Sequence, residues 1–159
     1  MIYLLPYKRT EYVIEIFHHI KQKLGDEEFK RLFEVILTDN GTEFSDPDSI
    51  EFSFATGEKL CSVFYCDPNC SWQKGSLEKN HEYIRYVLPK GTSFAGLTQE
   101  DCNLLASHIN AVPRVSLNNL SPYEYAYSFI GQKNMDKFNI SRVPYDYLEN
   151  RLKNVQLRQ

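Results

Sequence analysis

The chain has 159 residues, of which 42% are hydrophobic and 25% are charged, and its formal net charge is −3. This composition excludes a disordered chain and argues against a protein that wraps nucleic acid over its whole surface. The length allows one domain with its own core, and no apolar run approaches the roughly 20 residues of a membrane helix.

The first half of the chain is expected to alternate strands and helices. Apolar residues recur at helical spacing between the cap Thr10 and Gly25, which predicts a helix there. Short apolar runs bounded by turn residues predict strands. The strands are expected at Ile2–Leu5, Val35–Leu37 and Ser62–Tyr65, with short helices around 29–33 and after the cap Asp46-Pro47.

The second half is expected to be mainly helical. A helix capped by Ser76 should run to about Leu88, where Pro89 and Gly91 stop it. Capping signals predict further helices after Thr98 with Asp101 and after Ser121 with Pro122 and Glu124, and a last helix is expected from Pro144. Strands and helices together indicate an α/β or mixed domain.

The four cysteines are Cys61, Cys66, Cys70 and Cys102, and they form no C-x-x-C pair. Structural zinc sites and redox motifs use such pairs, so we expect free thiols. The first residues carry neither a basic leader nor a small-residue cleavage site, so we expect a cytoplasmic protein.

Asp39 follows directly on the strand-forming run Val35–Thr38 and precedes Asn40-Gly41. Open α/β sheets bind ligands at the carboxyl ends of their strands, so Asp39 is a candidate site residue. The alternative is an Asx turn, because Asp-Asn-Gly is common turn material. The residues alone leave both interpretations open.

Glu78 lies in the first turn of the helix capped by Ser76, where the helix dipole favours a carboxylate. Two other charged residues, Glu82 and Arg85, follow Glu78 at helical spacing and share its face. The apolar stripe beside them is expected to consist of Leu77, His81, Ile84 and Leu88.

Basic residues flank the face that carries Glu78; they are Lys74, Lys79 and Lys90. A basic rim around carboxylates suits a phosphodiester near a metal ion. The alternative is a solvated helix face with ordinary ion pairs. Mg²⁺ prefers oxygen ligands, and two such ions about 4 Å apart can carry phosphoryl transfer. Holding both ions takes at least three carboxylates, of which Asp39 and Glu78 would supply two.

Several motifs, in the right order, resemble those of known DNA-processing enzymes. The segment Thr38–Phe44 resembles the second-aspartate motif of retroviral-type integrases and of bacterial transposases with an Asp-Asp-Glu triad. The segment Phe64–Phe94 resembles the glutamate region of the insertion-sequence-thirty transposase family. The matching motifs there are Cys66-Asp67-Pro68, Ser71–Gly75, Glu78–His81, Ile84-Arg85 and Leu88–Phe94, and His108–Asn110, Arg114 and Ser121–Glu124 continue the likeness downstream.

This resemblance implies an RNase H-like integrase core, in which a mixed five-stranded sheet is flanked by helices. It implies that Asp39 and Glu78 are the second and third members of a triad that binds Mg²⁺ or Mn²⁺. It also implies DNA contacts from the basic residues of the glutamate region, namely Lys74, Lys79, Arg85 and Lys90.

The family's first aspartate and the first two strands of its sheet would precede Met1. We therefore expect residues 1–130 to be a catalytic-core fragment lacking those strands, and residues 131–159 to be a helical extension. By family the function is metal-dependent DNA cleavage and strand transfer, in a fragment that is inactive alone. The expected partners are transposon ends and target DNA, with homo-oligomers possible, no membrane, and a location at the nucleoid when bound to DNA. The alternatives are a non-catalytic fragment that binds DNA or pairs with a transposase, and a pseudogene remnant.

Overall fold

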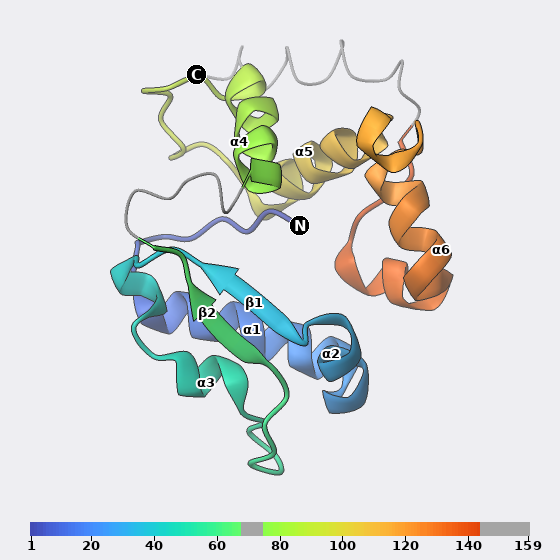
Figure 1. Ribbon diagram of the computed structural model, residues 1–159. Coiled ribbons are helices and arrows are strands. Elements are labelled where there is room, and N and C mark those ends of the chain that lie inside the picture. The colour runs from blue at the N-terminus through green and yellow to red at the C-terminus, as the bar shows by residue number, and fades with distance from the viewer. Residues whose placement is uncertain (68–74, 144–159) are drawn as a thin grey trace. The chain divides into compact units, whose positions relative to one another are not determined.

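The computed structural model describes residues 1–67 and 75–143. It divides the chain into two compact units, which we call the sheet unit (Leu5–Gly75) and the helical unit (Met1–Leu4 with Ser76–Gln159). Both units are coloured by residue number in Figure 1. Within the described residues, every helix is too short or too polar to span a bilayer.

The sheet unit contains two parallel strands, β1 (Val35–Thr38) and β2 (Ser62–Tyr65). Val35 pairs with Ser62 and Thr38 pairs with Tyr65, so the carboxyl ends of both strands lie side by side. Three helices belong to this unit: α1 (Thr10–Leu24), α2 (Asp26–Leu32) and α3 (Pro47–Glu51), with a 3-10 turn at Thr42–Phe44.

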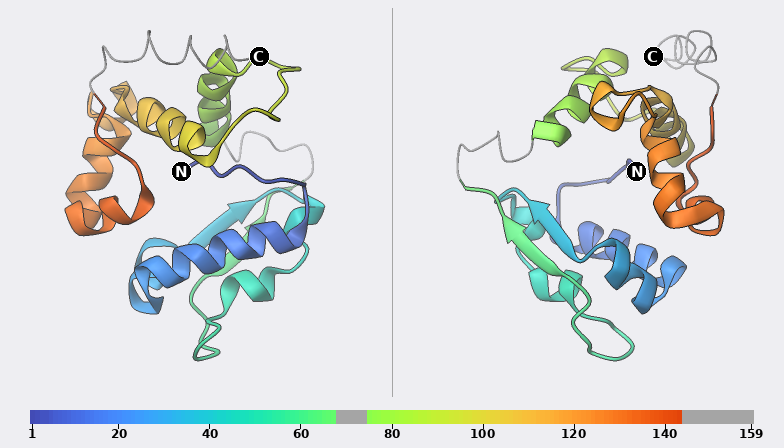
Figure 2. Two further views of the ribbon diagram at one scale, coloured as in Figure 1. Left: turned by 180° about the vertical axis from the view of Figure 1, so that it is seen from behind. Right: turned by 45° about the vertical axis from the view of Figure 1, so that its right-hand side comes forward.

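Helix α1 lies along one face of the sheet, as the front and rear views in Figures 1 and 2 show. Its apolar stripe buries Val13, Ile20 and Leu24. Phe29 of α2 and Ile50 of α3 are fully buried, at 0% exposure. The core of this unit therefore lies between α1, its neighbouring helices and one face of the sheet.

The other face of the sheet is apolar and open. Side chains alternate along a strand, so Val35 and Leu37 share a face with Phe64, which pairs with Leu37. Their exposed fractions are 62%, 46% and 54%, whereas Thr38 on the opposite face is 4% exposed. The described helices of the sheet unit thus cover one face of it.

The helical unit is built from α4 (Gly75–Val87), α5 (Gln99–Ala111) and α6 (Pro122–Met135), with 3-10 turns at Val115–Leu117 and Asp136–Phe138. Helix α6 lies beside α5, as both views in Figure 2 show. The buried apolar side chains come mostly from α5 and are Cys102, Leu105, Ala106 and Ile109, together with Met135 of α6.

The predicted strand at Ile2–Leu5 is wrong. The segment is extended, but a side chain takes the place of a neighbouring strand: the backbone N–H of Leu4 donates to Gln99 Oε1 at 3.0 Å. Gln99 Nε2 in turn donates to the carbonyl of Ile2 at 2.9 Å. These two bonds anchor the N-terminal residues to the start of α5.

Within the described residues the predicted helices form, but two of the predicted caps are wrong. Helix α1 begins at Thr10 itself, and the Thr10 hydroxyl donates instead to the carbonyl of Thr42 at 3.0 Å. Helix α4 begins at Gly75, so Ser76 lies inside it. The predicted caps at Asp46, Thr98 and Ser121 are confirmed, the last two as capping boxes.

The mixed α/β class is confirmed, with a two-stranded parallel sheet in the part of the chain that the structure describes. Cys61, Cys66 and Cys102 are free thiols, as predicted, and all three are buried. Cys70 and the helix expected from Pro144 lie outside the described residues. The boundary expected between residues 130 and 131 stays a prediction.

Candidate functional site

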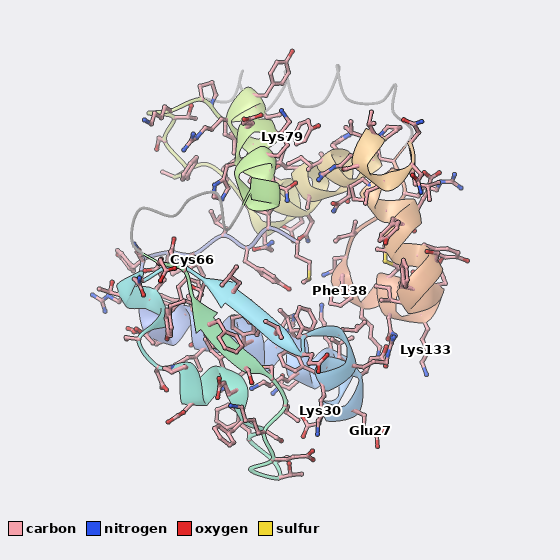
Figure 3. The ribbon with its side chains drawn as sticks, in the orientation of Figure 1. Glu27, Lys30, Cys66, Lys79, Lys133 and Phe138 are labelled. Atoms are coloured by element: carbon pink, nitrogen blue, oxygen red, sulfur yellow. The ribbon has the colours of Figure 1, made fainter. Side chains whose placement is uncertain are left out.

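The carboxyl ends of β1 and β2 bring two aspartates to one edge of the sheet. Asp39 follows β1 directly, and Asp67 follows β2 after Cys66, which is labelled in Figure 3. The backbone N–H of Cys66 donates to the carbonyl of Thr38 at 2.9 Å, and Asn40 Nδ2 donates to the carbonyl of Cys66 at 3.0 Å. Both aspartates are exposed at this edge.

The sequence singles out Asp67 only within the motif Cys66-Asp67-Pro68 and does not reveal that it lies at the same end of the sheet as Asp39. The missing information was the strand register, because it is the pairing of Thr38 with Tyr65 that brings the two strand ends together. Carboxylate oxygens are the donors that Mg²⁺ and Mn²⁺ prefer, so the chemistry of this edge fits such an ion.

The loop after Asp39 is held from two sides. The carbonyl of Thr42 accepts a bond from Thr10 of α1, and the hydroxyl of Ser45 lies 3.0 Å from the Thr10 hydroxyl. The Tyr65 hydroxyl at the end of β2 donates to the carbonyl of Phe44 at 2.5 Å. The chain leaving Asp39 is therefore tied to the sheet unit's own helix and strand.

Glu78 lies in the first turn of α4, in the helical unit, while Asp39 belongs to the sheet unit. On the same helix Lys79 forms an ion pair with Glu82 at 2.5 Å, and this hydrogen bond raises the pKa of Lys79. Lys79, labelled on α4 in Figure 3, and Arg85 are both exposed.

The remaining predicted basic residues differ in what can be said of them. Lys90 is exposed just after the end of α4, and Lys74 lies outside the described residues. Among the described residues Arg85 forms no ion pair, in contrast to Lys79. Arg85 and Lys90 therefore offer the less compensated positive charge on this element.

The apolar stripe predicted for α4 is partly wrong. His81 is exposed, whereas the polar residues Asn80 and Tyr83 are half-buried. The physical reason is Arg114, whose Nη2 donates to Asn80 Oδ1 at 2.9 Å and whose Cζ lies 5.4 Å from the centre of the Tyr83 ring. The contact with Arg114, which is 34 residues from Asn80 in the sequence, thus accounts for the burial of this side of α4.

Among the described residues, no group of three or more His, Cys, Asp and Glu side chains is placed to hold a metal ion. The candidate ligands in the described part of the chain are therefore Asp39 and Asp67 at the carboxyl ends of the strands, and Glu78 in the first turn of α4.

Three relatives place the sequence among known proteins. It is 36% identical over 93 residues to the transposase for insertion sequence element IS1086 of Cupriavidus metallidurans, covering 58% of this chain and 26% of the relative. It is 39% identical over 75 residues to transposase InsI for element IS30A of Escherichia coli, and the match covers 47% of this chain and 19% of the relative. It is 33% identical over 107 residues to the transposase for element IS4351 of Bacteroides fragilis, and the match covers 67% of this chain and 31% of the relative.

The chain thus spans between 19% and 31% of the length of these relatives. No family model and no solved structure matches it. These relatives confirm the resemblance to transposases of the insertion-sequence-thirty family, to which the chain is similar over part of their length.

Proposed function

We propose that this chain carries two metal-binding carboxylates, Asp39 and Glu78, of a transposase core that cuts and joins DNA with Mg²⁺ or Mn²⁺. The observation that carries the proposal is the position of Asp39, which is exposed at the carboxyl end of a parallel strand in a chain whose relatives are transposases. The proposal includes an RNase H-like sheet, with which the parallel β1–β2 pair is compatible.

The chain's own residues would divide the work between metal and DNA. Divalent ions at such a site activate the attacking hydroxyl and stabilise the leaving oxygen of the phosphodiester. Asp39 and Glu78 would hold and orient them through oxygen ligands. The exposed cations Arg85 and Lys90 would contact backbone phosphates, which position DNA without reading its sequence.

Titration of Mn²⁺ into the full chain, followed by the electron paramagnetic resonance signal of the free ion, tests the proposal. Asp39→Asn and Glu78→Gln should each weaken the tightest binding by more than about tenfold, because each removes a ligand charge. Asp48→Asn and Glu100→Gln are matched controls, since both residues are exposed acids in the first turns of other helices.

The double variant separates one shared site from two independent ones. If Asp39 and Glu78 hold the same ion, the double variant should bind no more weakly than either single variant once that site is lost. Strictly additive losses, or binding that neither single variant changes, would contradict the assignment.

The resemblance assigns only two carboxylates of this chain to the triad, and a pair of divalent ions normally takes ligands from at least three. We therefore expect the chain by itself to bind Mn²⁺ but to leave supercoiled DNA intact. Nicking of that DNA by the purified chain, abolished in Asp39→Asn, would show that the ligand set is already sufficient.

A second candidate function is a non-catalytic protein that pairs with another transposase chain through its sheet. The observation that favours it is the open apolar face of Val35, Leu37 and Phe64, next to the outer edge of β1, which no strand of the described residues occupies. Such an edge invites strand addition. Sedimentation of the chain, alone and in the Leu37→Lys variant, distinguishes the functions: concentration-dependent association lost in the variant favours pairing.

A further inference from the structure

We propose that Arg114 is a positioning residue, which holds α4 by the face opposite Glu78 and so fixes the direction in which the Glu78 face is presented. This inference rests on the proposed metal-binding role of Glu78. Arg114 itself follows α5 and belongs to the helical unit.

Arg114 makes two different contacts to α4. Its Nη2 donates to Asn80 Oδ1 at 2.9 Å. Its Cζ lies 5.4 Å from the centre of the Tyr83 ring, within the range of a cation–π contact. A planar guanidinium can donate from its edge and stack through its face at the same time, which a lysine ammonium cannot do.

Helix geometry places these contacts on the side of α4 away from Glu78. Each residue turns the helix by about 100°, so Asn80 lies about 200° and Tyr83 about 140° around from Glu78. On the near side, Glu82 and Arg85 are exposed. The clamp formed by Asn80, Tyr83 and Arg114 thus leaves the charged face of α4 free.

The backbone of Arg114 is itself held by the loop that follows it. Its N–H donates to the carbonyl of Leu120 at 3.0 Å, and its carbonyl accepts from the N–H groups of Leu117 and Asn119 at 2.9 and 3.0 Å. Asn118 and Asn119 adopt left-handed backbone angles, with φ of 54° and 62°, which close the loop. The backbone position of Arg114 is therefore fixed by three hydrogen bonds within residues 114–120.

The charge of Arg114 is not neutralised within the described residues. No carboxylate forms an ion pair with it, and its Nε is buried with no hydrogen-bond partner there. A structural arginine is usually paired with an acid, because burying an unpaired charge is costly. Arg114 is half-buried, and among the described residues its guanidinium contacts the Asn80 amide and the Tyr83 ring.

Hydrogen exchange of the full chain tests the clamp without any metal. Arg114→Ala and Asn80→Ala should each speed the exchange of α4 amides about tenfold, since a hydrogen bond to a charged group is lost. Exchange in α1 should not change. Arg142→Ala is the matched control, because Arg142 also pairs within the helical unit but with Glu124, at 3.3 Å. Arg114→Lys should restore only part of the protection.

Mn²⁺ affinity then separates this inference from the function on which it rests. Arg114→Ala should weaken Mn²⁺ binding about tenfold in a chain that retains Glu78. When it is added to Glu78→Gln, the same substitution should cause no further loss of Mn²⁺ affinity. If Glu78→Gln loses affinity but Arg114→Ala and Asn80→Ala retain it, Arg114 has no positioning role. If Glu78→Gln binds Mn²⁺ as the parent does, the proposed function fails and the inference falls with it. Unchanged α4 exchange in Arg114→Ala overturns the inference alone.

Discussion

The carboxylate of Glu51 accepts a 2.7 Å hydrogen bond from the backbone N–H of Val63. The N–H groups of Ser62 and Cys66 bond toward β1, so the N–H of Val63, which alternates with them, points to the outer edge of β2. Lys59 holds the same carboxylate at 2.8 Å. The outer edge of β2 is thus partly closed by a side chain, and a strand added at that edge would have to displace Glu51.

Removing the Glu51 side chain should destabilise the sheet unit. Glu51→Ala leaves the Val63 N–H without its acceptor and should lower the free energy of unfolding by about 2 kcal/mol. Glu51→Gln keeps an acceptor oxygen and should cost less than half as much. Urea denaturation followed by circular dichroism measures both, and equal costs for the two variants would contradict this role of the oxygen.

The same carboxylate should make stability depend on acid. Hydrogen bonds from Lys59 and from the backbone of Val63 lower the pKa of Glu51 below its ordinary value of 4.5. A lowered pKa in the folded state contributes stability that is present above the ordinary value and is lost as the pH falls through the folded value. Repeating the denaturation at decreasing pH should show a steeper loss in the parent chain than in Glu51→Ala.

Lys21 connects α1 to the end of α3 by hydrogen bonds, so an apolar residue in its place should destabilise the folded chain. The residue is 5% exposed, and its Nζ donates to the carbonyls of Phe52 at 2.7 Å and Ser49 at 3.3 Å, at the end of α3. A helix of five residues is not stable by itself, so the two hydrogen bonds from Lys21 help to stabilise α3. Lys21→Met should lower the free energy of unfolding by about 2 kcal/mol. Lys23→Met, in the same helical turn, is the control and should cost much less.

Local signals in the sequence predicted the elements whose stabilising bonds are themselves local. The box at Ser121 and Glu124 joins residues three apart, so four consecutive residues of sequence were enough to place the start of α6. The strand-forming run at Val35–Thr38 likewise predicted β1. Asp39 at the end of that run was found because strand ends can be read locally.

Contacts between distant residues could not be predicted in the same way. Gln99 bonds to residues 95 and 97 positions away, and this bond pair replaced the strand expected at the N-terminus. Asp67 joined Asp39 at the sheet edge only through the β1–β2 register. The clamp of Arg114 on Asn80 inverted part of the expected stripe on α4. In each case residues far apart in the sequence form a contact that periodicity does not show.

Acid should also act through His108, which is 1% exposed in α5 and has no hydrogen-bond partner for either ring nitrogen within the described residues. Burial lowers the pKa of His108 below its ordinary value of 6.5. The unfolded chain then takes up a proton first, so stability should fall as the pH drops below that ordinary value. His108→Leu should flatten the dependence of the melting temperature on pH between about 7 and 5.

A second histidine contributes to this pH experiment. Burial and the charge of Lys21 also lower the pKa of His18, so a remaining slope in His108→Leu should disappear when His18→Leu is added. A His108→Leu profile as steep as that of the parent would exclude His108 as a source of the effect.

Charge on α4 should govern DNA affinity through Arg85 more than through Lys79. Arg85 is exposed without an ion pair among the described residues, whereas Lys79 is paired with Glu82. A lost phosphate contact reduces the slope of log affinity against log salt by about 0.9. Fluorescence anisotropy with a labelled duplex, between about 50 and 200 mM salt, should show this reduction for Arg85→Ala and a smaller one for Lys79→Ala. Arg31→Ala, which removes a cation paired with Glu28 in the sheet unit, should leave the slope as it is. An equal slope in Arg85→Ala and the parent would remove α4 from the DNA-binding surface.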